Sequence, residues 1–321
     1  MRIEIWADVV CGWAYIGKRR LEKALASWEG EPVEVVWRPY QIDPSAPARA
    51  VPLAETLRDP MVDEALQACS PGPSPAESRE RVAGIAAAEG LGPQWGATWR
   101  ASTFDAHRLI ALAYESGGAE TQSAVVERVL RAHFVETLDI SDPAVLAAIA
   151  GEHGVPWDGR GAESVRELLL TGKAKGVRTS PTIVANGLAL AGAQPPEEIA
   201  RFLEGAAGHV PRRLPAEVER LRHAESLLDR RDPLGALTLL GPLLDEHGSD
   251  RGVRLLAARA YFASAQLGRA RAALESLVAD APDDSYARHL LGRTLQRQGK
   301  PEEAASHLTL AAVMTPDYAA G

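Results

Sequence analysis

The chain has 321 residues, 46% of them hydrophobic, which is enough for two domains with substantial cores and excludes a disordered protein. The net charge of −8 is spread along the chain, so neither nucleic acid nor an anionic membrane surface is an expected partner. Apolar runs are too short for a transmembrane helix, and the two cysteines cannot form a disulfide framework. No signal-peptide pattern opens the chain, so we expect a cytoplasmic protein.

The beginning of the chain predicts alternating strands and helices. Residues 2–7 alternate in the manner of a strand, and residues 12–29 follow as a helix with one apolar face. A second strand is expected over 33–39. A long, mostly helical insertion then runs from about 45 to 175, with a loop rich in proline at 70–75.

The elements after the insertion complete the first domain. Two short apolar runs within 181–191 flank Asn186-Gly187, which predicts a hairpin with a type I′ turn. A last helix is expected to start near Pro196. This order matches an α/β thioredoxin-like fold with a helical insertion, which we place at 1–208, before a linker within 205–215.

The remainder, residues 213–321, contains an internal repeat of 34 residues. This is the period of tetratricopeptide repeats, and it separates four residue pairs: Pro282 and Pro316, Ala270 and Ala304, Leu274 and Leu308, Leu256 and Leu290. With a degenerate unit over 217–250, three units predict an all-α tetratricopeptide-like domain. We expect it to hold a protein partner or a second copy of the chain. A plain helical bundle and a packing extension without a partner remain alternatives.

Cys11 lies between the first strand and the following helix, where a thioredoxin fold has its active site. Unpaired backbone N–H groups and the positive end of the helix dipole favour a thiolate there, and a thiolate is the nucleophilic form of cysteine. The alternative is that Cys11 is a small packed hydrophobe.

Residues 1–206 resemble the DsbA-like thioredoxin-fold family, and within it the FrnE-like branch of dithiol–disulfide isomerases of polyketide pathways. The resemblance rests on segments in the family's order: 8–17 (Asp-Val-Val-Cys-Gly-Trp-Ala-Tyr-Ile-Gly), 37–44, 102–109, 139–143, 180–182 and 192–196. It implies that Cys11 is the nucleophilic thiol and that Pro181 is the cis-proline beside it. It also implies that the Ser180 backbone pairs with a bound thiol compound.

Ala14 departs from that family, whose usual motif is Cys-x-x-Cys. Without a second cysteine, Cys11 has no neighbour to resolve a mixed disulfide. Three interpretations remain. A monothiol oxidoreductase or isomerase uses Cys11 with an external thiol. A thiol-dependent isomerase or transferase acts on an electrophilic small molecule in a biosynthetic pathway. A redox-inactive module binds partners through its repeats.

Other residues are predicted to complete this site. The resemblance places His107 and Arg108 near Cys11, on a helix opening after Ser102 with Asp105 at capping-box spacing. His107 would supply positive charge or move a proton, whereas helix packing is its alternative role. Substrate would be bound by Trp13, Ala14, Arg108, Ser180 and Pro181.

The remaining candidates are assigned minor roles or none. Lys18 is expected to face solvent. Cys69 is either incidental or a remote resolving thiol. No metal-ligand spacing is present, so we expect no metal and no bound cofactor. A low-molecular-weight thiol would serve as co-substrate, and the excess of arginine over lysine makes mycothiol as plausible as glutathione.

Overall fold

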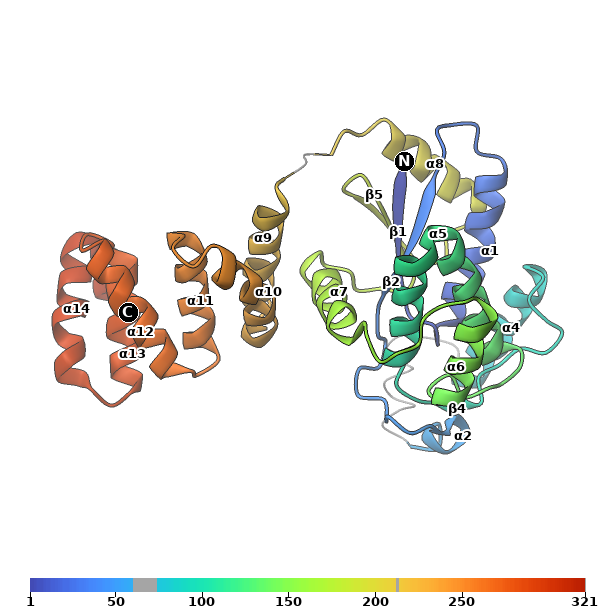
Figure 1. Cartoon of the computed structure of the whole chain (residues 1–321), viewed down its shortest axis with the longest axis horizontal. Coiled ribbons are helices and arrows are strands. Elements are labelled where there is room, and N and C mark those ends of the chain that lie inside the picture. The colour runs from blue at the N-terminus through green and yellow to red at the C-terminus, as the bar shows by residue number, and fades with distance from the viewer. Residues whose placement is uncertain (60–73, 212–213, 321) are drawn as a thin grey trace. The chain divides into compact units, whose positions relative to one another are not determined.

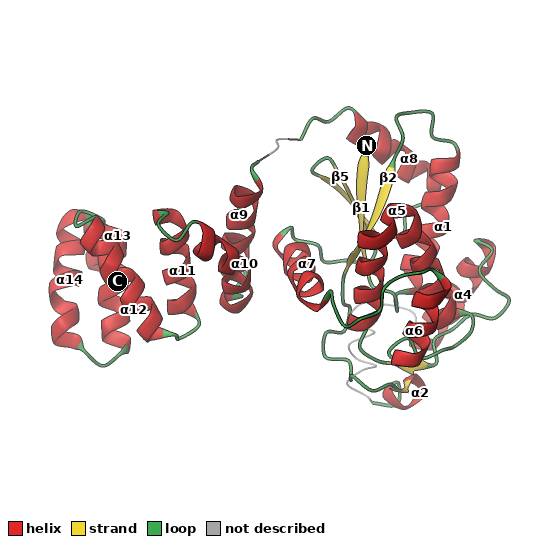
Figure 2. Cartoon of the chain, in the orientation of Figure 1, coloured by secondary structure: helices red, strands yellow, loops and turns green. Residues whose placement is uncertain are grey.

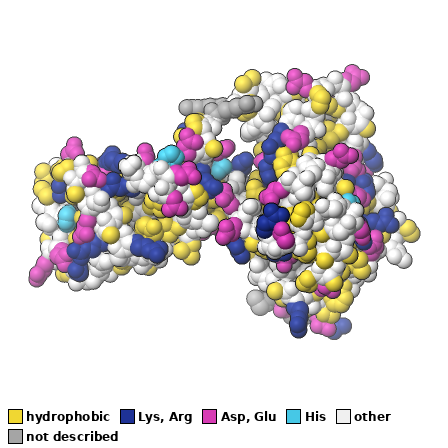
Figure 3. Space-filling view, in the orientation of Figure 1, with side chains coloured by type: hydrophobic (Ala, Val, Ile, Leu, Met, Phe, Trp, Pro, Cys, Tyr) yellow, Lys and Arg dark blue, Asp and Glu magenta, His cyan; other side chains and the backbone are white. Residues whose placement is uncertain are grey.

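The computed structural model describes residues 1–59, 74–211 and 214–320. Cys69 and residues 70–73 of the proline-rich loop lie outside the described residues. The chain divides into two compact units, one of residues 1–172 with 176–212 and one of 173–175 with 213–321 (Figure 1). On the face drawn in Figure 3, acidic and basic side chains are intermixed, which agrees with the dispersed charge of the sequence.

A four-stranded mixed sheet forms the centre of the first unit (Figure 2). Its strands are β1 (Arg2–Ala7), β2 (Glu34–Pro39), β5 (Thr182–Ala185) and β6 (Leu188–Ala191), in the order β2-β1-β5-β6. β1 pairs in parallel with β2 and antiparallel with β5. The expected strands are therefore confirmed, and the order is that of a thioredoxin-like fold.

The hairpin between β5 and β6 turns where the sequence predicts it. Asn186 and Gly187 both have positive φ, at 47° and 84°, as a type I′ turn requires. β5 and β6 pair antiparallel on either side.

Helices cover both faces of the sheet. On one face, Ile5 contributes to an apolar seam with α1 (Gly12–Ala26) and α8 (Pro196–Ala207). On the other face, Trp6 packs against Gly172 of α7 (Ala162–Ala174). Residues alternate along β1 because successive side chains of a strand point to opposite faces.

Gly172 in α7 makes room for the indole of Trp6. A Cβ built on Gly172 would lie 2.6 Å from a ring carbon of Trp6, whose side chain is 1% exposed and rigid. We expect Gly172→Ala to lower the stability of the first unit by about 1–3 kcal/mol, since overpacking forces a backbone shift. Urea unfolding followed by tryptophan fluorescence reports this unit, because all seven tryptophans lie in it.

Gly84→Ala is the matched control for that substitution. Gly84 lies within α4 (Pro75–Ala88), and nothing lies within 4 Å of a Cβ built there. In this open helical position alanine should stabilise by about 0.5–1 kcal/mol. Equal effects of the two substitutions would contradict the proposed contact.

The segment between β2 and α7 is mostly helical, with two short strands that the sequence pattern does not reveal. It contains β3 (Val51–Pro52), α2 (Leu53–Thr56), α4, β4 (Trp99–Arg100), α5 (Phe104–Phe134) and α6 (Pro143–Glu152). α5 is interrupted at Gly118, with φ 69° and ψ −162°. The predicted capping box at Ser102 and Asp105 is wrong, because the N-cap is Thr103 and makes no side-chain capping bond.

Gln122 of α5 pairs with the outer edge of β2. Its Oε1 accepts a hydrogen bond from Trp37 N–H at 2.8 Å, and its Nε2 donates to Trp37 O at 3.1 Å. The Gln122 amide thus bonds the backbone N–H and C=O of Trp37, which a further strand would otherwise pair with. These bonds satisfy buried polar groups at the sheet edge and hold α5 beside β2.

The second unit consists of three helix pairs, as the repeat period predicts. They are α9 (Ala216–Asp229) with α10 (Pro233–Glu246), α11 (Arg251–Ala263) with α12 (Leu267–Asp280), and α13 (Ser285–Arg297) with α14 (Pro301–Met314). A short 3₁₀ helix, Pro316–Ala320, follows. Gly292 of α13 lies directly against Leu308 of α14, so the small residue permits close helix packing. Among the described helices, none is both long and apolar enough to cross a membrane.

Candidate active site

Cys11 is the N-cap residue of α1, with φ −88° and ψ 112°. Its side chain is 7% exposed, and its Sγ donates a hydrogen bond to Ser180 O at 3.3 Å. The Ser180–Pro181 peptide bond is cis. The structure therefore brings together three residues that the resemblance assigns to one site, although 169 residues separate Cys11 from Ser180.

The surroundings of Cys11 oppose its ionisation more than the sequence suggested. Burial raises the pKa of the Cys11 thiol, and the negative charge of Asp8 acts in the same direction. Hydrogen bonding by the Ser180 side chain and by the backbone N–H groups of Ala14 and Trp13 lowers that pKa but does not outweigh burial. The helix terminus thus acts in the expected direction, but the effect of burial on the pKa of Cys11 is larger.

Asp8 connects the segments around Cys11. It is 1% exposed, its backbone O accepts from Cys11 N–H at 3.1 Å, and its backbone N–H donates to Ser180 Oγ at 2.9 Å. Oδ2 accepts from Ile42 N–H at 2.7 Å, and Oδ1 lies 3.3 Å from Nε2 of His107. The buried carboxylate of Asp8 therefore touches the loop after β2 and the first turn of α5, while its backbone N–H bonds the cis-proline loop.

His107 contacts Asp8 and the loop after β2. Its Nε2 lies 2.9 Å from Tyr40 O and 3.3 Å from Asp8 Oδ1, and since both oxygens are acceptors, Nε2 carries a proton. Within the described residues, His107 forms no hydrogen bond with Cys11. Its position is that of a residue that holds Asp8 and Tyr40, one step away from the thiol.

Arg108 and Trp13 each stack with a side chain outside the group formed by Cys11, Ser180 and Pro181. Arg108 forms an ion pair with Asp105 at 3.0 Å, and its guanidinium lies 4.2 Å from the ring centroid of Trp157. None of its polar contacts in the described part of the chain reaches Cys11. Trp13 is half-buried, packs against the core and lies beneath Arg81, whose guanidinium is 6.0 Å from its ring centroid.

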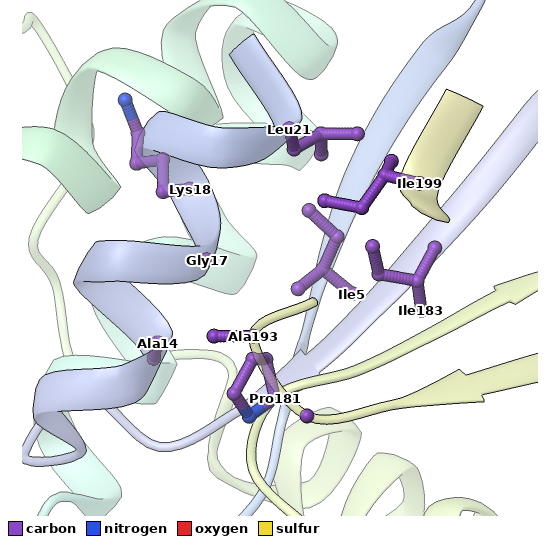
Figure 4. A pocket seen from close by; sticks show the side chains of 10 residues that line it. Ile5, Ala14, Gly17, Lys18, Leu21, Pro181, Ile183, Ala193 and Ile199 are labelled. Atoms are coloured by element: carbon purple, nitrogen blue, oxygen red, sulfur yellow. The ribbon is translucent and has the colours of Figure 1, made fainter. Parts of the chain in front are cut away.

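Ala14 occupies the position of the family's second cysteine. It is 1% exposed and lines a narrow apolar cavity of about 10 Å³ with Gly17, Pro181 and Ala193 (Figure 4). A volume of this size admits about one water molecule, and the apolar lining favours an empty cavity. The side chain of Ala14 therefore faces a space between small residues of α1 and the cis-proline loop.

Lys18 is buried at 6% exposure, so the expectation that it faces solvent is wrong. Its Nζ points away from the cavity in Figure 4 and lies 2.8 Å from Glu127 Oε2 and 2.5 Å from Glu22 Oε1. Glu127 lies on α5, far along the chain, so helical periodicity alone did not reveal the buried ion pair that draws Lys18 inward.

His133, near the end of α5, is a buried polar group that the sequence did not single out. It is 2% exposed and packs edge-on against Phe134, and its Nε2 has no hydrogen-bond partner among the residues that the structure describes. Burial lowers the pKa of His133 to about 4, although the charges of Asp8 and Asp139 act in the opposite direction. The neutral imidazole is therefore part of the folded state.

The depressed pKa of His133 predicts a loss of stability in acid. The unfolded chain binds a proton near pH 6.5 and the folded one near pH 4, so stability is lost as the pH falls through this window. Between pH 7.5 and 5 we expect a loss of about 2 kcal/mol from this group, measured by urea unfolding with tryptophan fluorescence. His133→Leu should remove most of that loss and His209→Leu, at an exposed site, none. An unchanged pH dependence in His133→Leu would contradict the assignment.

The residues that sequence reasoning missed are Asp8, Tyr40 and His133. Asp8 and Tyr40 lie inside two segments that carry the family resemblance, which is the signal that would have found them. Burial raises the pKa of the Tyr40 phenol, and the negative charge of Asp8 acts in the same direction. Within the described residues, no group of three or more His, Cys, Asp or Glu side chains is arranged to hold a metal ion.

Comparisons with known proteins agree with this arrangement. The family model of the DSBA-like thioredoxin domain matches residues 2–204, and a tetratricopeptide repeat model matches residues 227–294. The chain is 30% identical to a probable DsbA oxidoreductase from Streptomyces coelicolor, with a TM-score of 0.54 over 67% of this chain and 94% of the other. A search of curated proteins returned no match.

Two further solved structures are more distant. One is a 2-hydroxychromene-2-carboxylate isomerase, at 17% identity and a TM-score of 0.43, covering 65% of this chain and 95% of the other. The other is the cytosolic disulfide reductase DsbM from Pseudomonas aeruginosa with GSH, at 18% identity and a TM-score of 0.42, covering 64% and 98%. The extent of the first family match decides the assignment: the chain belongs to the DSBA-like thioredoxin-domain family, and tetratricopeptide repeats follow that domain.

Proposed function

We propose that the first unit is a monothiol oxidoreductase or isomerase in which Cys11 exchanges disulfides with the help of an external thiol. The observation that carries the proposal is one thiol at the N-terminus of α1 that is hydrogen-bonded to the cis-proline loop. Ala14 stands where the motif of the family has its second cysteine. The finer placement in the FrnE-like branch stays a prediction.

The chemistry is a pair of exchanges without net oxidation. The Cys11 thiolate attacks one sulfur of a substrate disulfide, a Cys11–substrate disulfide forms, and the other substrate sulfur leaves as a thiolate. An external thiolate then attacks the substrate sulfur of that mixed disulfide and releases Cys11. Ala14 cannot perform the second step, so the external thiol is a reactant and not an accessory.

The missing second cysteine of the motif determines how this cycle ends. With alanine at position 14, a mixed disulfide on Cys11 has no neighbouring thiol in the motif and waits for attack by an external thiol. We propose glutathione or mycothiol for this role in a cytoplasmic setting, and a protein or small-molecule disulfide as substrate.

Refolding of scrambled ribonuclease tests the proposal. We expect activity that rises with added low-molecular-weight thiol and falls to a low level without it, where only thiolates released from ribonuclease itself can resolve the mixed disulfide. No activity with disulfides, together with thiol-dependent turnover of an electrophilic small molecule, would replace the proposal by the isomerase or transferase alternative. If the protein shows neither activity, the proposal is wrong and the interpretation as a binding module remains.

We propose that the repeat unit holds a protein partner or a second copy of the chain. Leu310, Val313 and Met314 share one face of α14 and are 44%, 76% and 43% exposed, which is unusual for large apolar side chains. If this face joins two copies, sedimentation velocity should detect a dimer that Val313→Lys converts to monomer. A monomeric wild-type chain at high concentration would exclude self-association.

A further inference from the structure

The outer edge of β2 is open beside the point where Gln122 covers it. β2 is the last strand on its side of the sheet, and both the N–H and the O of Trp37 bond Gln122, so the Trp37 backbone faces away from β1. Glu34 N–H faces the opposite way, because it donates to Met1 O at 2.8 Å. Since backbone groups alternate along a strand, the N–H and O of Val35 face outward as those of Trp37 do. Within the described residues, β1 is the one strand that pairs with β2.

A groove of about 660 Å³ runs along this open edge. One wall holds Val35 and the preceding Val33, and the facing wall holds the small residues Ala119, Ser123 and Ala124 of α5. Small side chains on the helix leave room beside the strand. A groove between a strand edge and a helix accepts an extended peptide that pairs its backbone with the edge.

The charges of the groove favour a basic occupant. Two cations and two carboxylates of α1 and α5 pair with one another in its wall, namely Lys18, Arg19, Glu22 and Glu127. Glu34 and Glu120 add two more carboxylates to the lining, and Arg2, at 3.9 Å from Glu34, offsets one of them in part. Glu120 is exposed, so a lysine or arginine side chain in the groove would be attracted to it.

From this geometry we propose that the open edge of β2 binds an extended polypeptide segment with a lysine or arginine side chain. The segment adds as a further strand, pairs with the backbone of Val33 and Val35, and places its cation near Glu120. The groove also borders α1, in which Lys18 lies about 10 Å along the helix axis from Cys11. A polypeptide held there keeps its other segments close to the thiol, a consequence that rests on the proposed function.

Two synthetic peptides test the proposal on the full-length protein. Both are acetylated, free of cysteine and about ten residues long; one alternates lysine with valine and the other glutamate with valine. We expect the lysine peptide to bind and to shift the NMR signals of the Val33 and Val35 amides. The glutamate peptide should bind at least about fivefold more weakly. A lysine peptide that leaves both amide signals in place would overturn the proposal.

Methylation of the peptide backbone separates strand addition from simple attraction between charges. Alternate amides of an added strand point toward β2, so N-methyl groups on every lysine or on every valine should block pairing in one case and have little effect in the other. Equal affinities of the two methylated peptides would contradict strand addition.

Glu120→Lys is the corresponding change in the protein, and it should weaken binding of the lysine peptide at least about fivefold. Glu115→Lys is its matched control, because Glu115 is an exposed residue of the same helix outside the groove lining. Equal losses in the two variants would overturn the proposal.

The remaining outcomes separate this proposal from its neighbours. A Val35 amide signal that shifts with protein concentration and ignores the lysine peptide would make a second copy of the chain the occupant and overturn the proposal. Binding is measured without turnover. Peptide binding without disulfide exchange would therefore overturn the proposed function alone, and disulfide exchange without peptide binding would overturn this proposal alone.

Discussion

Ala14→Cys should convert the protein into a dithiol oxidoreductase. Ala14 N–H donates to Cys11 O at 2.9 Å in the first turn of α1, so the new thiol lies one turn from Cys11, at the spacing of the family's motif. The added sulfur extends beside the narrow cavity against Pro181, which limits the cost of the larger side chain. Its thiolate would attack the mixed disulfide on Cys11, close an internal disulfide and release the substrate as a thiol.

The gain is measured as insulin reduction with dithiothreitol as the electron donor. We expect turnover to rise at least about tenfold, since an intramolecular thiol acts at a far higher effective concentration than an external one. Ala24→Cys is the matched control, because Ala24 is a buried alanine of the same helix roughly 15 Å further along its axis. If Ala24→Cys gains as much, or Ala14→Cys gains nothing, the interpretation of residue 14 is wrong.

Cys11→Ser should abolish disulfide exchange while leaving the fold intact. Serine keeps a donor for Ser180 O and replaces a nucleophilic sulfur by a hydroxyl that is not activated in this site. We expect the thiol-dependent rate to fall at least about 100-fold, to the level of the external thiol alone. The urea midpoint of the first unit should remain nearly unchanged.

Cys69→Ser is the companion control, since Cys69 is the other thiol of the chain. Full activity in Cys69→Ser with loss in Cys11→Ser fits a monothiol cycle. A matched loss in both variants would instead make Cys69 the resolving thiol, and the external thiol would then be dispensable.

Local sequence signals predicted much of the fold. The type I′ turn is encoded by two adjacent residues, Asn186 and Gly187, which tolerate positive φ. The helix pairs of the second unit follow from a period of 34 residues, because each repeat must place its small and apolar residues alike to stack on its neighbour. The sequence did not predict β3 and β4, because a strand of two residues is too short to show a periodic pattern.

The site was predictable only in part, because its chemistry depends on contacts distant in the chain. The position of Cys11 before α1 is local, and the cis-proline loop came from the resemblance. Asp8 and His107 both lie in segments that carry the resemblance, but their contact spans 99 residues and neither segment shows that the two side chains meet. Lys18 was misjudged for the same reason, since its partner Glu127 comes from another helix.

The central claim is that Cys11 carries a mixed disulfide that an external thiol resolves. Wild-type protein is incubated with a disulfide-containing peptide, quenched in acid, and analysed by intact mass and peptide mapping, before and after addition of glutathione or mycothiol. We predict a peptide adduct on Cys11 that persists in the absence of the added thiol and disappears when it is supplied. An adduct that resolves without added thiol, a disulfide between Cys11 and Cys69, or an unmodified Cys11 would contradict the account.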